Sequence, residues 1–146
     1  MPNIYQLYEN VRKMDDIEDI TRTVVLDSVS QDLLIELQKD QLMRGENERG
    51  ESIEPEYASF SYAKFKNRIN PRAGFGTPDM KYTGAFFNAF FFDEDDLEVY
   101  SRDEKVERLI AKYGDIFGFH RESLDPYAAY FIRNFKEEFM SQMTGE

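Results

Sequence analysis

The stretch Lys81–Ser101, KYTGAFFNAFFFDEDDLEVYS, contains five of the chain's 13 phenylalanines within seven residues. Burying a single phenylalanine side chain contributes roughly 1.5–3 kcal/mol. A cluster of this size therefore outweighs any other local feature of the sequence, and we expect the hydrophobic core to form around it. The cluster is a folding signal and does not by itself indicate an activity.

The first half of this stretch predicts a short helix. Thr83 is a suitable N-cap residue, since its hydroxyl can accept a hydrogen bond from a backbone amide of the first turn. Phe86, Phe87 and Phe90 follow at spacings of one, three and four residues. Spacings of three and four are typical of an apolar stripe along one or two helical turns.

The second half predicts a β-hairpin. Phe90 and Phe92 fall on the same side of a strand, because side chains alternate between the two faces. The four acids Asp93–Asp96 then form a turn, and Leu97 and Val99 alternate with polar residues as in a returning strand.

The N-terminal third predicts long helices. Asn3–Lys13 is expected to form a short helix, and Asp16–Met43 contains neither proline nor glycine. This second segment is expected to be one helix, or two that meet near Asp27–Ser30, with Ser30 as the second N-cap. Such length exceeds the needs of one small core, which leaves part of a face either for a neighbouring chain or simply for solvent.

The middle of the chain alternates loops and a helix. Arg44–Pro55, with two glycines, is expected to be a mobile loop, and Tyr57–Ile69 a helix. In that helix aromatic residues alternate with Lys64, Lys66 and Arg68. This pattern occurs on nucleic-acid-binding surfaces, but the acidity of the chain favours contact with acidic residues of the same or an adjacent subunit.

The segments that follow also have recognisable boundaries. Asn70–Asp79 has two prolines and two glycines and predicts a connector, since its glycines match neither a P-loop nor a dinucleotide fingerprint. Asp103–Tyr113 predicts a helix that ends at Gly114. Asp125 and Pro126 are typical of the start of a final helix. Its apolar face is expected to pack on the hairpin and comprises Leu124, Ala128, Phe131, Phe135 and Phe139.

These elements together predict an α+β fold: long N-terminal helices and a C-terminal helix packed on a small antiparallel sheet. At 146 residues the chain fits one domain, with a helical region over 1–45 and a core over 57–146. The predicted core residues are Phe86, Phe87, Phe90, Phe92, Leu97, Val99, Phe131 and Phe135.

Composition excludes several classes of protein. The net charge of −11 disfavours tight binding to nucleic acid or to an anionic membrane. The absence of cysteine excludes disulfides and thiolate metal sites. No apolar run reaches the roughly 18 residues typical of a membrane span, and the N-terminus lacks the apolar segment of a signal peptide. We therefore expect a soluble, cytoplasmic protein with no membrane partner.

No residue pattern predicts an active site. His120 is the only histidine, and nothing around it resembles a nucleophile elbow. The acids Asp93–Asp96 lack the spacing and glycine of a calcium-binding EF-hand loop, which favours a solvated turn. We expect no catalytic, cofactor-binding or metal-binding residues and no enzyme. A hydrolase would require activity that is lost on changing His120 or the Asp93–Asp96 acids.

The order of the parts resembles a family of tailed-bacteriophage structural proteins, the head-to-tail joining and tail-completion proteins of the virion neck. In that family a helical N-terminal region precedes a Thr-Gly-aromatic motif, a strand pair, a helix that ends at a glycine, and a C-terminal helix that begins with proline. The matching pieces here are Tyr82–Phe86, Phe91–Ser101, Leu109–Gly114 and Asp125–Pro126. The resemblance as a whole extends over about the last two-thirds of the chain.

The resemblance implies a virion structural protein, present in the host cytoplasm during assembly. Sister copies form a ring below the portal, next to other neck, portal or tail proteins, and DNA passes through the ring without specific binding. No cofactor is implied. The loops Arg44–Pro55 and Asn70–Asp79 are the candidate contacts between subunits, through Arg44, Glu48, Arg49, Arg72 and Phe75.

A second interpretation is a phage-encoded regulatory or inhibitory protein. Such a protein acts as a monomer or dimer and uses its acidic surface to mimic DNA. Presence or absence in purified virions distinguishes the two interpretations.

Overall fold

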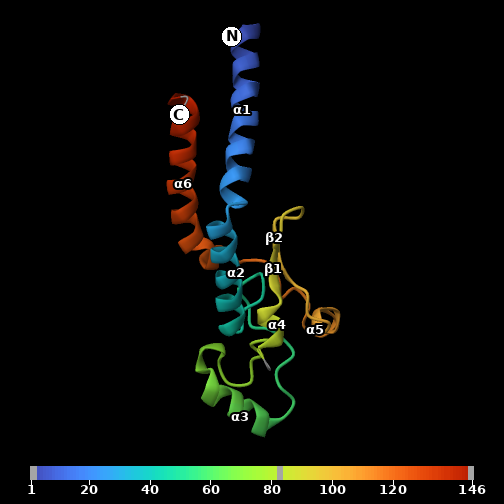
Figure 1. The fold of residues 1–146 in the computed structure, drawn as a ribbon. Helices are drawn as coiled ribbons and strands as arrows, with labels where there is room; N and C mark the ends of the chain where they lie inside the picture. Colours follow the sequence, from blue (N-terminus) through green and yellow to red (C-terminus); the bar gives the residue numbers. More distant parts are fainter. Residues whose placement is uncertain (1–2, 82–83, 145–146) are drawn as a thin grey trace. The chain divides into compact units, whose positions relative to one another are not determined.

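A computed structural model describes residues 3–81 and 84–144. The fold is α+β, as predicted: the described residues form helices α1–α6, two short 3₁₀ turns and one two-stranded antiparallel sheet (Figure 1). The chain divides into two compact units, Met1–Gln31 with Pro126–Glu146, and Asp32–Asp125. The predicted single domain, with the C-terminal helix grouped with the hairpin, stays a prediction.

The first unit is built on two antiparallel helices, α1 (Ile4–Val25) and α6 (Asp125–Thr144) (Figure 1). Asn3 begins α1 through a capping box with Gln6, in which each side chain accepts the other residue's backbone amide. The predicted short helix over 3–13 is therefore the first half of one longer helix. Ile20 and Val24 are its buried apolar side chains.

The break between α1 and α2 (Ser28–Met43) lies at Leu26–Asp27, so the two-helix alternative is confirmed. The predicted cap is wrong, however. The Asp27 carboxylate accepts the Val29 amide at 2.9 Å, and Ser30 lies inside the helix. Ser30 is fully buried and shares a 2.7 Å hydrogen bond with the Tyr127 hydroxyl of α6, which explains why a serine stands there.

Aromatic rings follow one another along α6. The Phe131 ring lies 5.7 Å from that of Phe135, which lies 6.4 Å from that of Phe139. These side chains are only half-buried or exposed, so Phe131 and Phe135 are not core residues as predicted. Helix α6 packs on α1 along one side only, so its aromatic rings remain partly exposed to water (Figure 1). Their packing on the hairpin stays a prediction, because helix and hairpin belong to different units.

The predicted helix and hairpin are both confirmed in the second unit. Helix α4 (Ala85–Asn88) leads into β1 (Phe90–Asp93) and β2 (Glu98–Ser101). Phe92 pairs with Val99 across the sheet, and both are buried. The N-cap of α4 is Gly84, in the left-handed region at φ 90°. The candidate cap Thr83 lies outside the described residues.

Leu97 does not belong to the core, contrary to prediction. The returning strand begins one residue later, at Glu98, and Leu97 is 45% exposed in the turn with φ 56°. Asp93 fixes that turn, because its carboxylate accepts the backbone amides of Asp95 and Asp96. Turn geometry therefore overrides the alternating pattern.

The remaining helices of this unit follow the predicted segments. Ser59 caps α3 (Phe60–Ile69), and α5 (Val106–Tyr113) ends at Gly114 with φ 77°. The 3₁₀ turns are η1 (Pro71–Ala73) and η2 (Arg121–Leu124). The buried apolar side chains are Leu34, Leu42, Ile53, Ala63, Met80, Phe86, Phe87, Phe90, Phe92, Val99, Leu109, Tyr113 and Ile116.

Two fully buried glutamines of α2 hold the segment between α5 and η2. Gln38 accepts the Gly118 amide at 2.8 Å. Gln41 donates to the Gly118 carbonyl at 2.8 Å and to the Asn47 carbonyl at 2.9 Å, and it accepts the His120 amide at 3.2 Å. Backbone groups of two loops are thus paired with one helix, which satisfies polar atoms that water cannot reach.

We predict that Gln41→Leu destabilises the protein by at least about 2 kcal/mol, because each buried group left unpaired costs about 1–3 kcal/mol. Urea unfolding followed by circular dichroism measures the loss. The control is Gln142→Leu on the exposed face of α6, which should change stability by no more than about 0.5 kcal/mol. Equal effects of the two variants would show that the buried hydrogen bonds of Gln41 do not matter.

Candidate functional site

The second unit contains a buried ion pair. Lys66 Nζ lies 2.9 Å from Asp79 Oδ1, and both side chains are almost fully buried. Asn70 donates to the other Asp79 oxygen at 2.9 Å and to the Met43 carbonyl at 2.7 Å. The Lys66 ammonium also donates to the Lys81 carbonyl. The pair is fully hydrogen-bonded, so it fixes α3 and the 70–81 connector in one arrangement.

The hydroxyl of Tyr57 lies in the same region; it is buried and makes no hydrogen bond of standard geometry with another described residue, although the Asp79 backbone lies near enough to lower its pKa. Burial raises the pKa of Tyr57, and the nearby Asp79 carboxylate raises that pKa further, since a phenolate there repels it. The Tyr57 ring packs edge to face on Tyr62, with centroids 4.9 Å apart. The Tyr62 pKa is raised for the same two reasons, burial first. Both phenols therefore stay neutral.

His120 forms a second polar cluster. Its Nε2 lies 2.8 Å from Glu46 Oε2, and the Arg44 Nε lies 3.5 Å from the same carboxylate oxygen. Arg44 also donates to the Ser123 hydroxyl at 2.7 Å. Arg44, and not His120, is thus the side chain that contacts Ser123. A serine nucleophile needs its hydroxyl within reach of a base, so this arrangement favours a structural role for the histidine.

Three of the residues predicted to contact neighbouring subunits are engaged within the chain. Arg44 binds Ser123, and the Arg49 guanidinium lies 3.2 Å from the Asp115 carboxylate. The Glu48 amide donates to the Asp115 carbonyl at 3.1 Å. The predicted mobile loop is therefore tied down at several points. A Cβ at position 50 would lie only 3.0 Å from the His120 ring. Glycine therefore allows this turn to pass close to the ring.

The other two predicted contact residues lie at the surface. The Arg72 guanidinium is half exposed and lies 3.9 Å from the Asp40 carboxylate, a weak surface pair. Phe75 is 51% exposed, and its ring lies 5.4 Å from the ring of Phe60. Their role in contacts between subunits stays a prediction.

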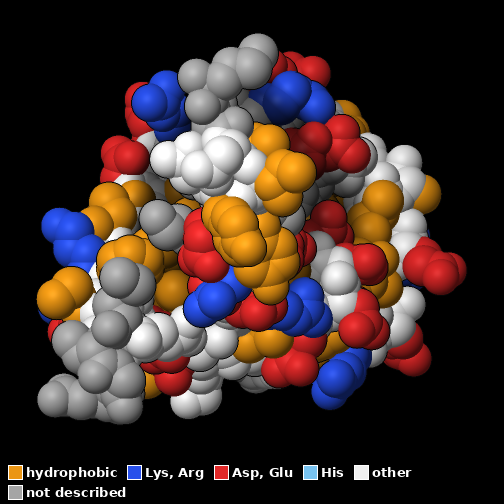
Figure 2. All heavy atoms as spheres, turned by 90° about the horizontal axis from the view of Figure 1, so that it is seen from above, with side chains coloured by type: hydrophobic (Ala, Val, Ile, Leu, Met, Phe, Trp, Pro, Cys, Tyr) orange, Lys and Arg blue, Asp and Glu red, His pale blue; other side chains and the backbone are white. Residues whose placement is uncertain are grey.

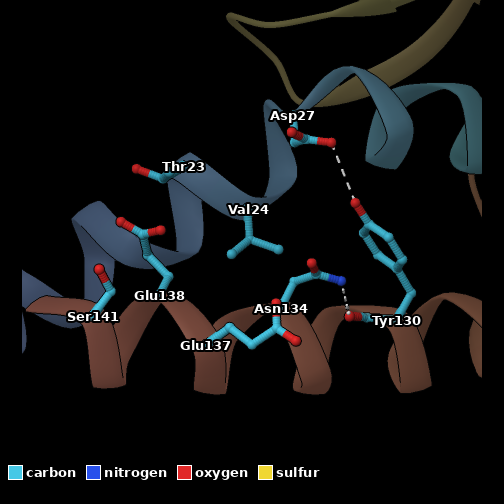
Figure 3. Close-up of a pocket in the computed structure, with 8 residues that line it drawn as sticks. All are labelled: Thr23, Val24, Asp27, Tyr130, Asn134, Glu137, Glu138 and Ser141. Atoms are coloured by element: carbon cyan, nitrogen blue, oxygen red, sulfur yellow. Dashed lines mark hydrogen bonds between the residues drawn. The ribbon is translucent and has the colours of Figure 1, made fainter. Parts of the chain in front are cut away.

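A polar groove runs between α1 and α6 in the first unit (Figure 3). Its volume is about 320 Å³, and Val24 lies between the two helices. The Tyr130 hydroxyl donates to Asp27 at 3.3 Å, and Asn134 donates to the Tyr130 carbonyl at 2.8 Å. Burial, followed by the Asp27 carboxylate, raises the Tyr130 pKa. These bonds lie within the helix pair and favour a structural groove.

The arrangement of the described acidic side chains does not indicate a metal site. Among residues 3–81 and 84–144, no group of three histidine or acidic side chains is arranged to hold a metal ion. The Asp93–Asp96 acids belong to the solvated turn described above. None of the described helices is long and apolar enough to cross a membrane.

Large apolar side chains are exposed on both units. On α1, Ile4 and Tyr5 are 82% and 83% exposed, and Leu7 and Tyr8 are more than half exposed. On α3, Phe60, Phe65 and Ile69 are 72%, 52% and 61% exposed. The space-filling view likewise has hydrophobic side chains at the surface among charged ones (Figure 2). Sequence periodicity did not predict that these apolar side chains are exposed. It shows that a helix has an apolar stripe, but not whether another part of the same chain packs against that stripe.

Basic side chains form two separate strips. Lys64 and Arg68 lie one turn apart on the exposed side of α3. On α5, Arg108 and Lys112 lie one turn apart beside a hollow of about 320 Å³ that Lys105 also lines. In the part of the chain that the structure describes, none of these side chains forms an ion pair with a carboxylate. Both strips therefore remain open to acidic partners.

We predict that Tyr57→Phe leaves stability unchanged or raises it by up to about 1 kcal/mol, because it removes a buried hydroxyl that makes no hydrogen bond of standard geometry with another described residue. Tyr127→Phe is the matched control. It deprives the fully buried Ser30 of its hydrogen bond and should cost about 1–3 kcal/mol. Chemical denaturation at pH 7 compares them. If Tyr57→Phe lost more free energy of unfolding than Tyr127→Phe, the Tyr57 hydroxyl would have to make a stabilising hydrogen bond, and the prediction would be wrong.

Stability should also fall in alkali. Burial raises the pKa of Tyr57 and of Tyr127 above the ordinary tyrosine value of about 10. The folded state therefore keeps its phenolic protons to higher pH than the unfolded state, so the contribution of these two tyrosines to stability is fully present well below pH 10 and is lost as the pH rises above it. Unfolding curves between pH 8 and about 11.5 measure this slope. In Tyr57→Phe we expect the free energy of unfolding to fall less steeply with pH. An unchanged slope would contradict the raised pKa of Tyr57.

Comparison with models of known protein families, with curated proteins and with solved structures finds no match to this chain.

Proposed function

We propose that this protein is a structural subunit of a homo-oligomeric ring in the neck of a tailed bacteriophage, between head and tail. The observation that carries the proposal is that each unit leaves large apolar side chains in water: Ile4 and Tyr5 on α1 in the first unit, and Phe60 on α3 in the second. Contiguous exposed apolar surface is typical of protein–protein interaction sites. The specific place in a virion neck comes from the resemblance of the sequence to joining and tail-completion proteins.

The internal structure of the second unit supports this proposal. Its loops are held by buried hydrogen bonds of Gln38 and Gln41 and by the Lys66–Asp79 ion pair. A unit fixed in this way presents its surface side chains in one arrangement, which lowers the entropic cost of forming contacts with sister copies. The polar clusters serve to position the backbone, and the exposed faces supply the contacts.

The charge of the chain suits a channel for DNA. With a net charge of −11, a ring of copies repels a polyanion over distances set by ionic strength. DNA then passes without adhering to the wall. Helix α1 carries four exposed acids within Asp15–Asp19, so acidic surface is available on an element that also bears exposed apolar residues.

Two measurements test the proposal. We expect the purified protein to form assemblies of many copies as its concentration rises, observed by sedimentation and as rings by electron microscopy. We also expect a fixed number of copies per particle in a protein inventory of purified virions of the encoding phage. A chain that stays monomeric at all concentrations and is absent from virions would overturn the proposal.

The second candidate is an acidic inhibitor that mimics DNA. The exposed carboxylates of Asp15, Asp16, Glu18 and Asp19 favour it, because a row of surface acids can imitate a phosphate backbone. This candidate predicts a monomer or dimer, no copies in virions, and displacement of DNA from a DNA-binding protein of the host. The virion inventory therefore separates the two candidates directly.

A further inference from the structure

The exposed side of α3 combines cationic and aromatic side chains. We call this surface the basic aromatic face: Phe60, Lys64, Phe65, Arg68 and Ile69 of α3, together with Phe75. All six side chains are exposed. The opposite side of the helix is anchored by buried Ala63 and by Lys66 in its ion pair with Asp79. The face is thus a fixed surface and not the product of a loosely attached helix.

The charge of this face is opposite to that of the protein. Residues 60–69 contain three basic residues and no acid, while the whole chain has 18 basic and 29 acidic residues. Lys66 is neutralised by Asp79, which leaves Lys64 and Arg68. Within the described residues neither has a carboxylate within ion-pairing distance. The complementary partner is therefore an acidic surface with apolar side chains beside it.

The chain itself contains such a surface on α1. The acidic stretch Asp15–Asp19 has four exposed carboxylates, and Ile4, Tyr5, Leu7 and Tyr8 precede it on the same helix with exposed fractions above one half. Among the described side chains, no ion pair engages these four acids. The acidic stretch thus has the charge opposite to that of the basic aromatic face, and apolar side chains precede it on the same helix.

The spacing of charges also matches. Lys64 and Arg68 are four residues apart on one helix, as are Asp15 and Asp19 on the other. In both helices this spacing is roughly 6 Å along the axis and slightly more than one full turn, so each pair projects from one side. Two cation–carboxylate contacts can therefore form together between helices that lie side by side, in either relative direction.

We propose that the basic aromatic face of one copy binds the acidic stretch of α1 in a second copy. This inference rests on the proposed function and specifies the contact that builds the ring. In a ring this contact is heterologous: each copy uses its basic aromatic face toward one neighbour and its acidic stretch toward the other. Such contacts close into rings or continue as filaments, whereas a contact between two identical surfaces stops at a dimer.

Charge reversal tests the contact. We expect Lys64→Glu with Arg68→Glu, and separately Asp15→Lys with Asp19→Lys, to weaken self-association by at least about tenfold, because each places like charges opposite one another. A variant with all four substitutions has opposite charges facing each other again, so it should associate nearly as strongly as the wild type. Arg108→Glu with Lys112→Glu is the control. These two cations on α5 have the same spacing, and the double variant should associate like the wild type.

Sedimentation velocity over a range of concentrations measures association, and circular dichroism with thermal unfolding checks that each variant is folded. Phe60→Ser adds a variant without charge change, which should also weaken association, since it removes exposed apolar surface from the face. Unchanged association in the Lys64/Arg68 variant would overturn the inference, as would failure of the combined variant to recover. Equal weakening by the Arg108/Lys112 variant would likewise overturn it, since general charge would then explain the effect.

The same experiment separates this inference from the proposed function. If the wild type assembles and reversal on α3 has no effect, the contact is wrong but the ring remains. If the wild type stays monomeric at every concentration, self-assembly itself fails, and the inference fails with it.

Discussion

The second unit depends on the buried pairing between α2 and the segment 116–120. Gln38 and Gln41 are fully buried, and their amide groups contact the backbone of Gly118 and His120 as well as the carbonyls of Ile116 and Asn47. A segment without regular structure can enter a protein interior only if its backbone groups find partners. With these partners in place, Ile116 of this segment is completely buried. The phenylalanine cluster can then pack as a core.

The sequence predicted the elements whose cause is local. The hairpin follows from Phe90 and Phe92 on one face and from turn residues at Asp93, and the end of α5 follows from Gly114. The start of α3 was predicted at Tyr57, three residues before the helix begins behind its cap Ser59. Leu97 shows the limit of this reasoning. Alternation placed it in the strand, but the side-chain hydrogen bonds of Asp93 extend the turn by one residue and leave Leu97 at the surface.

The interactions that join distant segments could not be predicted. A glutamine inside a helical pattern normally indicates the solvent side, so Gln38 and Gln41 gave no signal of burial. Lys66 likewise stood in a row of surface bases, and only the fold brings Asp79 to within 2.9 Å of it. The sequence did reveal the interleaved bases and aromatics of Tyr57–Ile69. The fold was needed to separate the buried Lys66 from the exposed Lys64 and Arg68.

This separation bears on how an acidic chain can associate with itself. Copies with a net charge of −11 repel one another, and the repulsion grows with each copy added. Apolar surface alone would have to overcome that repulsion at every contact. In the proposed contact, Lys64 and Arg68 on the basic aromatic face reverse the sign of the local interaction, so that the acidic charge of a second copy would be attracted there. The aromatic rings beside these cations would then distinguish this contact from one through the basic strip of α5, because they add apolar surface to the charge attraction.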